Sequence, residues 1–347
     1  MLKDLYNGGS QPFFYITLPY DKNINAQNWL VSGYNAYWVP TVYWDGGNIV
    51  QISDYNNYNN SINTCKNRAV ADIDAAIDVA WLGNATMEIS LSVDNNSAVN
   101  YDGFIRAYVC ELESSLNWRD SAGKLYTFPF LDWAMNQPIQ VAAGGTWQSS
   151  VTWIGAGHND GFGNTFGNIT PDNIMVIVAV ADGTPHQGYS DPPSGAPFDG
   201  YWLDACEGAR PAFYIDNVDP SFNAVGSWNT MSYPAAHGGT IHFSSPGGSP
   251  RYAIWRADTV LDPGRYEVSL WKFSNPYSSF LASGAPYRVH HATGVSGWIP
   301  VNWTTSGSEW IPLGTFDFDG VSPQGVVLTN QANGFVVADA LKFVPAD

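Results

Sequence analysis

The chain has 347 residues, of which 45% are hydrophobic and 15% aromatic but only 13% charged. Its 31 acidic residues against 14 Lys and Arg give a formal net charge of -17, which excludes nucleic acid and anionic membrane surfaces as favourable partners because their phosphates would be repelled. The longest apolar run, residues 174–181, is too short to cross a bilayer, so we expect a buried strand there and no membrane insertion. Glycines and prolines spread along the whole length predict a turn-rich, mainly β, multidomain and extracellular protein.

The first segment predicts a mixture of strands and helices. Residues 13–18 are rich in aromatic and β-branched side chains, which predicts a strand, and residues 25–34 follow with the apolar spacing of a helix. Residues 37–50 predict a hairpin around an Asp-Gly-Gly turn. An apolar stripe then predicts a second helix over residues 68–81.

This order of strand, helix and hairpin resembles the second half of a thioredoxin-like domain, and residues 39–47 resemble the cis-proline hairpin of that family. The resemblance implies an incomplete thioredoxin-like α/β domain over residues 1–82, whose first strand and C-x-x-C motif would lie upstream. Because the missing strand would pair beside residues 13–18, we expect the native polypeptide to continue upstream or another chain to donate a strand. The sequence contains no C-x-x-C motif, and Cys65 stands alone, so we expect no thiol exchange.

The middle segment predicts a β-sandwich. Residues 86–93 alternate between apolar and polar side chains, as in a strand with one buried face. Further strand-like runs occupy residues 104–111, 147–153 and 174–180. We therefore predict an immunoglobulin-like sandwich over residues 84–184. Residues 106–111 and 170–182 resemble the sandwich that follows a thioredoxin-like domain in bacterial surface and outer-membrane lipoproteins, which implies a surface location and no catalytic residue.

The loop over residues 157–164 combines an imidazole, a carboxylate and amides, which are possible ligands for a hard cation. Asn, Asp and Gly in such a loop more often form turns with their own side chains, and we favour that interpretation. Adjacent His290 and His291 would point to opposite faces of a strand and so would not bind one ion together. We predict no metal site and no cofactor.

Residues 185–210 have no periodicity and several prolines, which predicts a linker. The chain has 3 cysteines, so any disulfide leaves one thiol unpaired. A bridge between Cys110 and Cys206, which would tether the linker, is one alternative. The other is that all three are buried small residues without a bridge.

Residues 211–347 contain strand-like runs separated by Gly, Pro and Ser turns, which predicts a jelly-roll type of β-sandwich. The run over residues 335–343 predicts a strand buried between two sheets. The segment also holds the motifs Asp216-Asn217-x-Asp219, Val225-Gly226-Ser227-Trp228, Trp310-x-x-Leu313-Gly314-Thr315 and Asn333-Gly334-x-Val336-Val337-Ala338-Asp339. These motifs resemble the golvesin C-terminal and xanthan-lyase-associated domain. The resemblance implies a β-sandwich appended to secreted bacterial proteins, with a carbohydrate-binding-like role.

The same resemblance sorts the tryptophans of this segment. Trp228 and Trp310 fall on recurring motif positions, and we expect them in the core. Trp298 and Trp303 stand where the family has small or polar residues, on a strand that should turn one face outward, so we predict them as ligand-binding residues. Exposed indoles serve equally as platforms for sugar rings and as anchors in protein interfaces.

The sequence contains no nucleophile elbow, no H-E-x-x-H motif and no phosphate-binding loop, and its glutamates form no recognisable catalytic pair. We therefore predict no enzymatic activity. The favoured function is that of a secreted, non-catalytic cell-surface protein that binds polysaccharide or a cell-surface glycan for adhesion or attachment. The alternative is a structural subunit of an extracellular filament or tube, which self-associates by strand addition between chains. A redox enzyme would require a C-x-x-C motif upstream.

Overall fold

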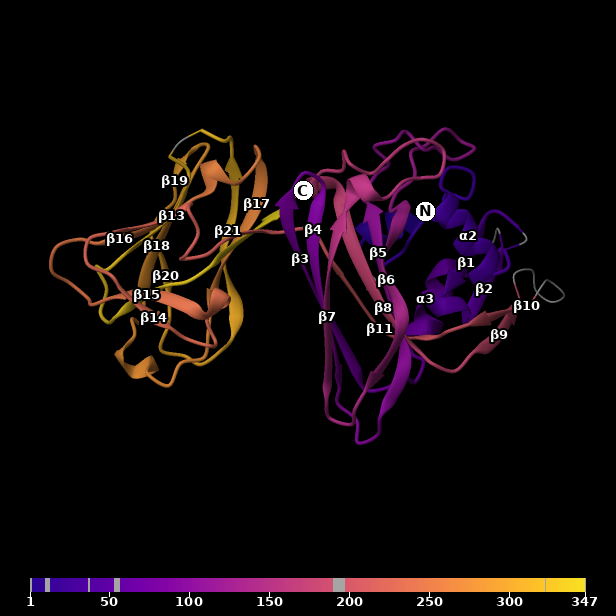
Figure 1. Cartoon of the computed structure of the whole chain (residues 1–347), viewed down its shortest axis with the longest axis horizontal. Helices are drawn as coiled ribbons and strands as arrows, with labels where there is room; N and C mark the ends of the chain where they lie inside the picture. Colours follow the sequence, from indigo (N-terminus) through magenta and orange to yellow (C-terminus); the bar gives the residue numbers. More distant parts are fainter. Residues whose placement is uncertain are drawn as a thin grey trace. The chain divides into compact units, whose positions relative to one another are not determined.

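The computed structural model describes residues 2–9, 13–36, 38–52, 57–189, 197–321 and 323–346. The chain divides into two compact units, Met1–Pro211 and Ala212–Asp347. Both consist mainly of antiparallel strands, which confirms the predicted mainly β, multidomain fold (Figure 1). In this described part of the chain, no helix has the length and apolar character needed to span a bilayer.

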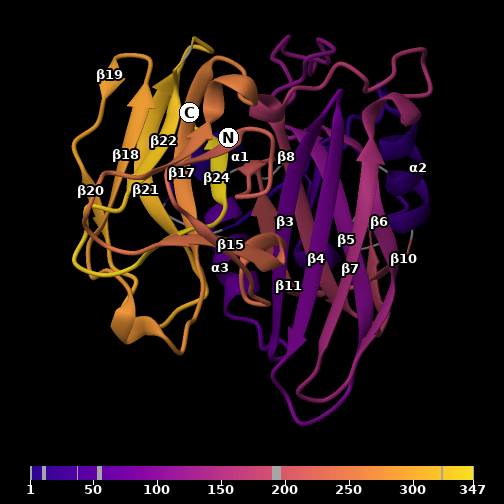
Figure 2. The same cartoon turned by 60° about the vertical axis from the view of Figure 1, so that its left-hand side comes forward.

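The first unit contains a sandwich of seven strands. They are β3 (Ile73–Gly83), β4 (Thr86–Asn95), β5 (Tyr101–Glu111), β6 (Phe130–Val141), β7 (Thr146–Ile154), β8 (Ile174–Asp182) and β11 (Leu203–Ala209). One sheet has the order β3-β4-β7, whose strands Figure 2 shows side by side, and the other has the order β11-β8-β5-β6. A single apolar cluster includes Ile89 of β4, Ile105 of β5 and Val176 of β8, so the two sheets pack face to face. The relationship to immunoglobulin-like domains stays a prediction.

The predicted helix over residues 68–81 is wrong, because most of this stretch forms β3. The strand pairs with β4 from Ile73 opposite Asn95 to Gly83 opposite Thr86. Its odd-numbered positions from 73 to 81 are all apolar, and Asp74 and Asp78 fall on even-numbered positions. This period of two is the signal of a strand, which the helical interpretation missed. The boundary expected between residues 82 and 84 therefore lies inside the β3–β4 hairpin.

The predicted linker over residues 185–210 is also partly wrong. Its last seven residues before Arg210 form β11, which pairs with β8 and completes the four-stranded sheet. Strands β9 (His186–Tyr189) and β10 (Pro197–Gly200) pair with each other. Residues 190–196 lie outside the described part of the chain. The sandwich accordingly extends from β3 to β11.

The segment before the sandwich contains short helices and one hairpin. It consists of α1 (Leu2–Asn7), α2 (Ile24–Gly33), β1 (Thr41–Trp44), β2 (Ile49–Ile52) and α3 (Tyr58–Lys66). The predicted helix over residues 25–34 corresponds to α2. The hairpin is confirmed by the pairing of β1 with β2, and the peptide bond before Pro40 is cis; Tyr37, the first residue of the predicted hairpin, lies outside the described residues.

The predicted strand over residues 13–18 is not formed. Within this stretch, the described ladder contact is a single bridge between Thr17 and Pro129. The Thr17 amide donates to the Phe128 carbonyl and the Thr17 carbonyl accepts from the Phe130 amide, each at 2.8 Å. The expected gap in a sheet beside residues 13–18 therefore has no counterpart, and the thioredoxin-like assignment stays a prediction.

The N-terminal segment covers the outer face of the β11-β8-β5-β6 sheet, as Figure 1 shows. Ala26 of α2 packs in one cluster with Tyr108 of β5, Phe130 of β6 and Ala179 of β8. The opposite face of the same sheet belongs to the core of the sandwich. Residues 174–181 of β8 are consequently buried at every position. This burial on both faces explains why that strand is an uninterrupted apolar run.

One buried polar side chain fixes α2 on the sheet. Asn23 is 0% exposed, and its Oδ1 accepts from the Asn25 amide at 2.9 Å, which caps the helix. Its Nδ2 donates to the carbonyls of Phe130 and Leu131, each at 2.8 Å. A single amide therefore satisfies the start of α2 and two carbonyls at the start of β6.

The second unit is built from three antiparallel sheets. The first has the order β12 (Phe213–Ile215), β24 (Leu341–Pro345), β17 (Gly264–Lys272), β21 (Glu309–Phe318). The second has the order β13 (Phe222–Val225), β16 (Tyr252–Arg256), β22 (Gly325–Thr329), β18 (Ala285–His291), β19 (Gly294–Val295), and β20 (Ile299–Val301) also pairs with β18. The third has the order β14 (Asn229–Ser232), β15 (Thr240–Ser244), β23 (Val336–Ala338). This arrangement is that of a β-sandwich-like unit.

The apolar run over residues 335–343 is divided between two sheets instead of forming one strand. Strand β23 pairs with β15, whereas β24 pairs with β12 and β17. Asp339 lies in the crossing between them and is 3% exposed. Its Oδ1 accepts from the Ala340 amide at 2.9 Å, and its Oδ2 accepts from the His237 amide at 3.3 Å. Burial, followed by the charge of nearby Asp216, raises the pKa of Asp339 to about 8.

We predict that Asn23→Ala lowers the free energy of unfolding of the first unit by about 2–4 kcal/mol, because it removes a helix cap and the buried side-chain donor to the Phe130 carbonyl. Chemical denaturation followed by fluorescence measures this difference. Asn28→Ala is the matched control, since Asn28 is exposed on the same helix. Equal stability of the two variants would contradict the anchoring role of Asn23.

We predict that Asp339 makes the second unit less stable as the pH rises from about 4 to about 8. The folded unit holds a proton on Asp339 over this window and the unfolded chain does not, so each pH unit costs about 1.4 kcal/mol of stability. Asp339→Asn should remove this contribution and stabilise the unit at pH 8 more than at pH 5. Calorimetric unfolding of both proteins at the two pH values measures it. If the difference in stability between the two proteins were the same at pH 5 and pH 8, Asp339 would be ionised in the folded unit.

Candidate functional site

The two tryptophans predicted as ligand-binding residues have opposite environments. Trp298 is 44% exposed, whereas Trp303 is 1% exposed and packs 5.5 Å from the Phe273 ring in the core. The prediction for Trp303 is therefore wrong. Side chains alternate along extended chain, so Val301 and Trp303 turn inward together while position 298 faces outward. The odd spacing of five residues between the two tryptophans already contained this signal.

Trp298 is held in place by a cation. It lies in the turn before β20, and the guanidinium carbon of Arg288 is 3.9 Å from the centre of its ring. Arg288 comes from β18, between Tyr287 and Val289, which are both buried, so its side chain lies on the outer face of the sheet. Such a contact fixes the orientation of an indole while leaving much of it accessible. Trp298, oriented by Arg288, therefore offers an exposed aromatic surface to a ligand.

Trp228 and Trp310 were expected in the core, and both are only partly buried. The Nε1 of Trp228 donates to the Val225 carbonyl at 3.2 Å, near the edge of the sheet. Trp310 lies 5.2 Å from the ring of Trp271 on the outer face of the four-stranded sheet. Motif position alone therefore did not identify core residues.

The Cys110–Cys206 bridge is wrong, and all three cysteines are free. Strands β5 and β11 lie on opposite sides of β8, where Cys110 faces Met175 and Cys206 faces Ala179. Positions two strands and four residues apart are about 16 Å apart, far beyond the 7 Å limit for a disulfide. The alternative of three buried thiols is also wrong, because Cys206 is exposed.

The thiols have no environment that favours a thiolate. Burial, together with the charge of Asp45, raises the pKa of Cys65 to about 11. Burial also raises the pKa of Cys110, helped by the neighbouring Glu111. The pKa of Cys206 is raised by partial desolvation of its thiol and then by the charge of Glu207, although the residue as a whole is exposed. Reactive cysteines show the opposite shift, since the thiolate is the nucleophile. The absence of thiol exchange stays a prediction.

The loop over residues 157–164 forms turns with its own side chains, as predicted. The Oδ1 of Asp160 accepts from the amides of Phe162 at 2.7 Å and Asn164 at 3.1 Å. The Oδ1 of Asn159 accepts from the Gly161 amide at 2.9 Å. His158 stacks on Trp153 and its Nδ1 lies 2.8 Å from a carboxylate oxygen of Asp132. These polar groups are used to fold the loop.

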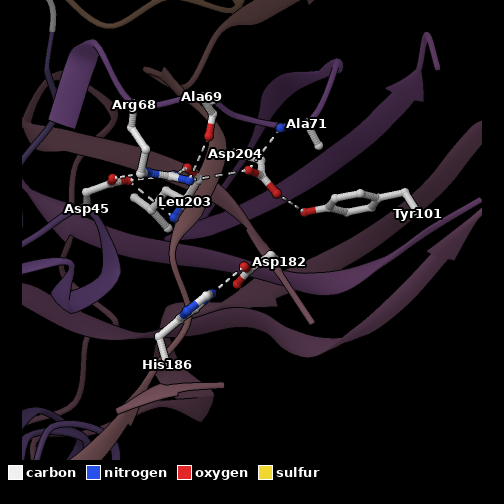
Figure 3. Close-up of polar contacts among 9 residues, drawn as sticks. All are labelled: Asp45, Arg68, Ala69, Ala71, Tyr101, Asp182, His186, Leu203 and Asp204. Carbon is white, nitrogen blue, oxygen red and sulfur yellow. Dashed lines mark hydrogen bonds and ion pairs between the residues drawn. The ribbon is translucent and has the colours of Figure 1, made fainter. Parts of the chain in front are cut away.

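A polar cluster in the first unit had no counterpart among the sequence predictions. Figure 3 shows Arg68 between Asp45 and Asp204, with Tyr101 beyond Asp204. The Nε of Arg68 donates to Asp45 Oδ2 at 2.7 Å, and a second guanidinium nitrogen donates to the Leu203 carbonyl. The residues come from four distant parts of the chain, so no local pattern could have predicted the cluster.

The cluster borders an open pocket of about 470 Å³, whose lining includes Asp182, His186 and Trp202. His186 stacks on the Trp202 ring at 3.8 Å, and its Nε2 lies 2.7 Å from Asp182 Oδ2 (Figure 3). The Tyr101 hydroxyl donates a hydrogen bond to Asp204 Oδ2 at 2.9 Å. Burial, together with the charge of that carboxylate, raises the pKa of Tyr101. The phenol therefore stays protonated and is a poor general base. The ion pairs tie the β1–β2 hairpin to β11.

The family comparison concerns the second unit. Residues 213–345 match the family model described as the Golvesin C-terminal domain. No curated protein matches the chain in sequence.

Among solved structures, the xanthan lyase of Paenibacillus is 15% identical with a TM-score of 0.37, covering 81% of this chain and 26% of that one. A β-glucosidase from Kluyveromyces marxianus is 9% identical with a TM-score of 0.22, covering 41% of this chain and 14% of that one. A β-glucosidase from Bifidobacterium adolescentis is 12% identical with a TM-score of 0.21, covering 41% and 17%. The chain thus spans about a quarter or less of each of these structures. The family match identifies the C-terminal unit as a golvesin-like β domain.

Proposed function

We propose that this protein is an extracellular, non-catalytic surface protein that attaches to polysaccharide or to a cell-surface glycan through Trp298. The observation that carries the proposal is the exposed indole of Trp298, which Arg288 holds on the outer face of a sheet. The flat apolar ring of an indole suits the CH-rich face of a pyranose. Because Arg288 already fixes the Trp298 side chain, little side-chain conformational entropy is lost when a sugar stacks on it. The golvesin resemblance, which implies a carbohydrate-binding-like role, agrees with this function.

The absence of catalysis is part of the proposal. The polar groups beside the pocket of the first unit are largely bonded to one another, with Arg68 held by Asp45 and Tyr101 by Asp204. A general acid or base needs a group that can exchange a proton near neutral pH, and the raised pKa of Tyr101 removes the phenol from that range. The arrangement supports a structural use of this cluster.

The filament alternative has lost its main support. It required an incomplete sheet beside residues 13–18 that another chain would complete, and these residues form no strand. Adhesion through a glycan does not depend on such a gap. We therefore retain attachment as the function and treat self-association as an outcome to be measured.

We predict that the full chain is retarded in native gels that contain a bound polysaccharide, and that Trp298→Ala weakens this binding at least about tenfold, as for the truncation of a central aromatic anchor. The panel would include cellulose derivatives, a soluble β-glucan and polygalacturonate. Tyr277→Ala is the matched control, because Tyr277 is 59% exposed in the same unit but lies outside the sheet that holds Trp298.

Light scattering of the same samples reports self-association independently of glycan binding. Retardation that survives in the Trp298 variant, or no retardation with any polymer of the panel, would overturn the proposed function.

A further inference from the structure

The sheet that carries Arg288 contains no carboxylate. Its strands read FNAV (β13), YAIWR (β16), GVVLT (β22), APYRVHH (β18), GV (β19) and IPV (β20). The whole chain has 31 acidic residues and a net charge of -17, and the β12-β24-β17-β21 sheet of the same unit carries Glu267, Glu309 and Asp317 on its strands. The ionisable side chains on the strands of the Arg288 sheet are two arginines, two histidines and two tyrosines. An anion therefore meets less repulsion on this face than on the β12-β24-β17-β21 sheet.

The register of the strands places Arg288 at one end of a row of four paired positions. Arg288 lies opposite Val327, Val327 lies opposite Ile254, and Ile254 lies opposite Asn223. Arg288, Val327 and Ile254 each lie between two buried neighbours, and Asn223 is exposed opposite Ile254, so the four side chains share the outer face. Trp298 covers the Arg288 end of this row. The outer face therefore combines two apolar side chains, a cation and an exposed indole.

Arg288 has no carboxylate partner among the residues that the structure describes. By contrast, Arg68 pairs with Asp45 at 2.7 Å and Arg256 pairs with Asp258 at 2.8 Å. The Nε atom of Arg288 is buried and has no acceptor within the described chain. The buried Nε lies out of reach of a ligand, so a carboxylate would bind the two terminal nitrogens of the guanidinium, which can donate two parallel hydrogen bonds.

The pKa of neighbouring His290 indicates that the surroundings of Arg288 are electropositive. Partial burial lowers the pKa of His290, and the positive charges of Arg288 and His291 lower it further. These neighbours disfavour another cation and favour an anion. The proposal below stands on the geometry of the Arg288 and Trp298 side chains, with which this shift agrees.

We propose that Arg288 and Trp298 form a subsite for a carboxylate-bearing sugar, that is, a uronic acid residue of an acidic polysaccharide. The pyranose ring would stack on the face of the indole that Arg288 does not cover, and its carboxylate would reach past the edge of the ring to the terminal nitrogens of the guanidinium, where the planar group suits bidentate recognition. This proposal rests on the proposed function and adds the class of glycan to it.

The test compares two polymers that share one sugar ring. Polygalacturonate carries free carboxylates, and highly methyl-esterified pectin carries the same groups as neutral esters. We expect the full chain to bind polygalacturonate at least about tenfold more tightly than the ester, with an affinity that falls as salt is raised. Arg288→Gln should remove this preference, and Arg288→Lys, which keeps the charge, should retain part of it.

The controls separate this proposal from the broader function. Arg265→Gln makes the same change of charge at an exposed arginine on β17, in the other large sheet, and should leave binding within about twofold. Thermal melting of each variant verifies folding. Equal binding of both polymers, unaffected by Arg288→Gln, would overturn the uronic acid subsite and leave glycan attachment standing.

Two further results would be informative in different ways. Binding to neither polymer nor to any neutral glycan would overturn the proposed function together with the subsite. Strong binding of dextran sulfate that depends on Arg288, without binding of polygalacturonate, would overturn the carboxylate assignment and point to sulfated sugars.

Discussion

The architecture of the first unit depends on one sheet being buried on both faces. The strands β11, β8, β5 and β6 pack against β3, β4 and β7 on one side and against the N-terminal segment on the other. Because every position of residues 174–181 is buried, β8 cannot carry a polar side chain without cost. Asn23 then supplies the hydrogen bonds that hold α2 on this surface. The N-terminal segment is thus a covering layer of the sandwich.

Local patterns predicted much of this fold. The continuous run of β8 and the alternation of β4 indicated buried and half-buried strands, and both strands are present. The helical interpretation of residues 68–81 failed because small alanines on both faces blurred an alternation that the aspartates mark clearly. Residues 13–18 have strand composition, yet they pack through aromatic side chains without a partner strand beyond one bridge. Pairing is a tertiary property, and composition does not determine it.

The site was less accessible from sequence than the fold. Trp298 was identified from its departure from a family motif, whereas its companion Trp303 was misassigned because motif comparison ignored the alternation of the strand. Arg288 was not predicted at all, since it lies ten positions before Trp298 and only the pairing of β19 and β20 with β18 brings the two together. The Arg68 cluster shows the same limit over a longer separation. Both groupings arise from the topology of the chain.

The central claim is that Trp298 and Arg288 form the surface on which a glycan binds. The most direct measurement is a crystal structure of the full chain with a bound oligogalacturonate. The account predicts a sugar ring stacked on the indole of Trp298, with its carboxylate in hydrogen-bond distance of the Arg288 guanidinium. An oligosaccharide bound in the pocket beside His186 and Trp202, with the Trp298 face empty, would contradict it.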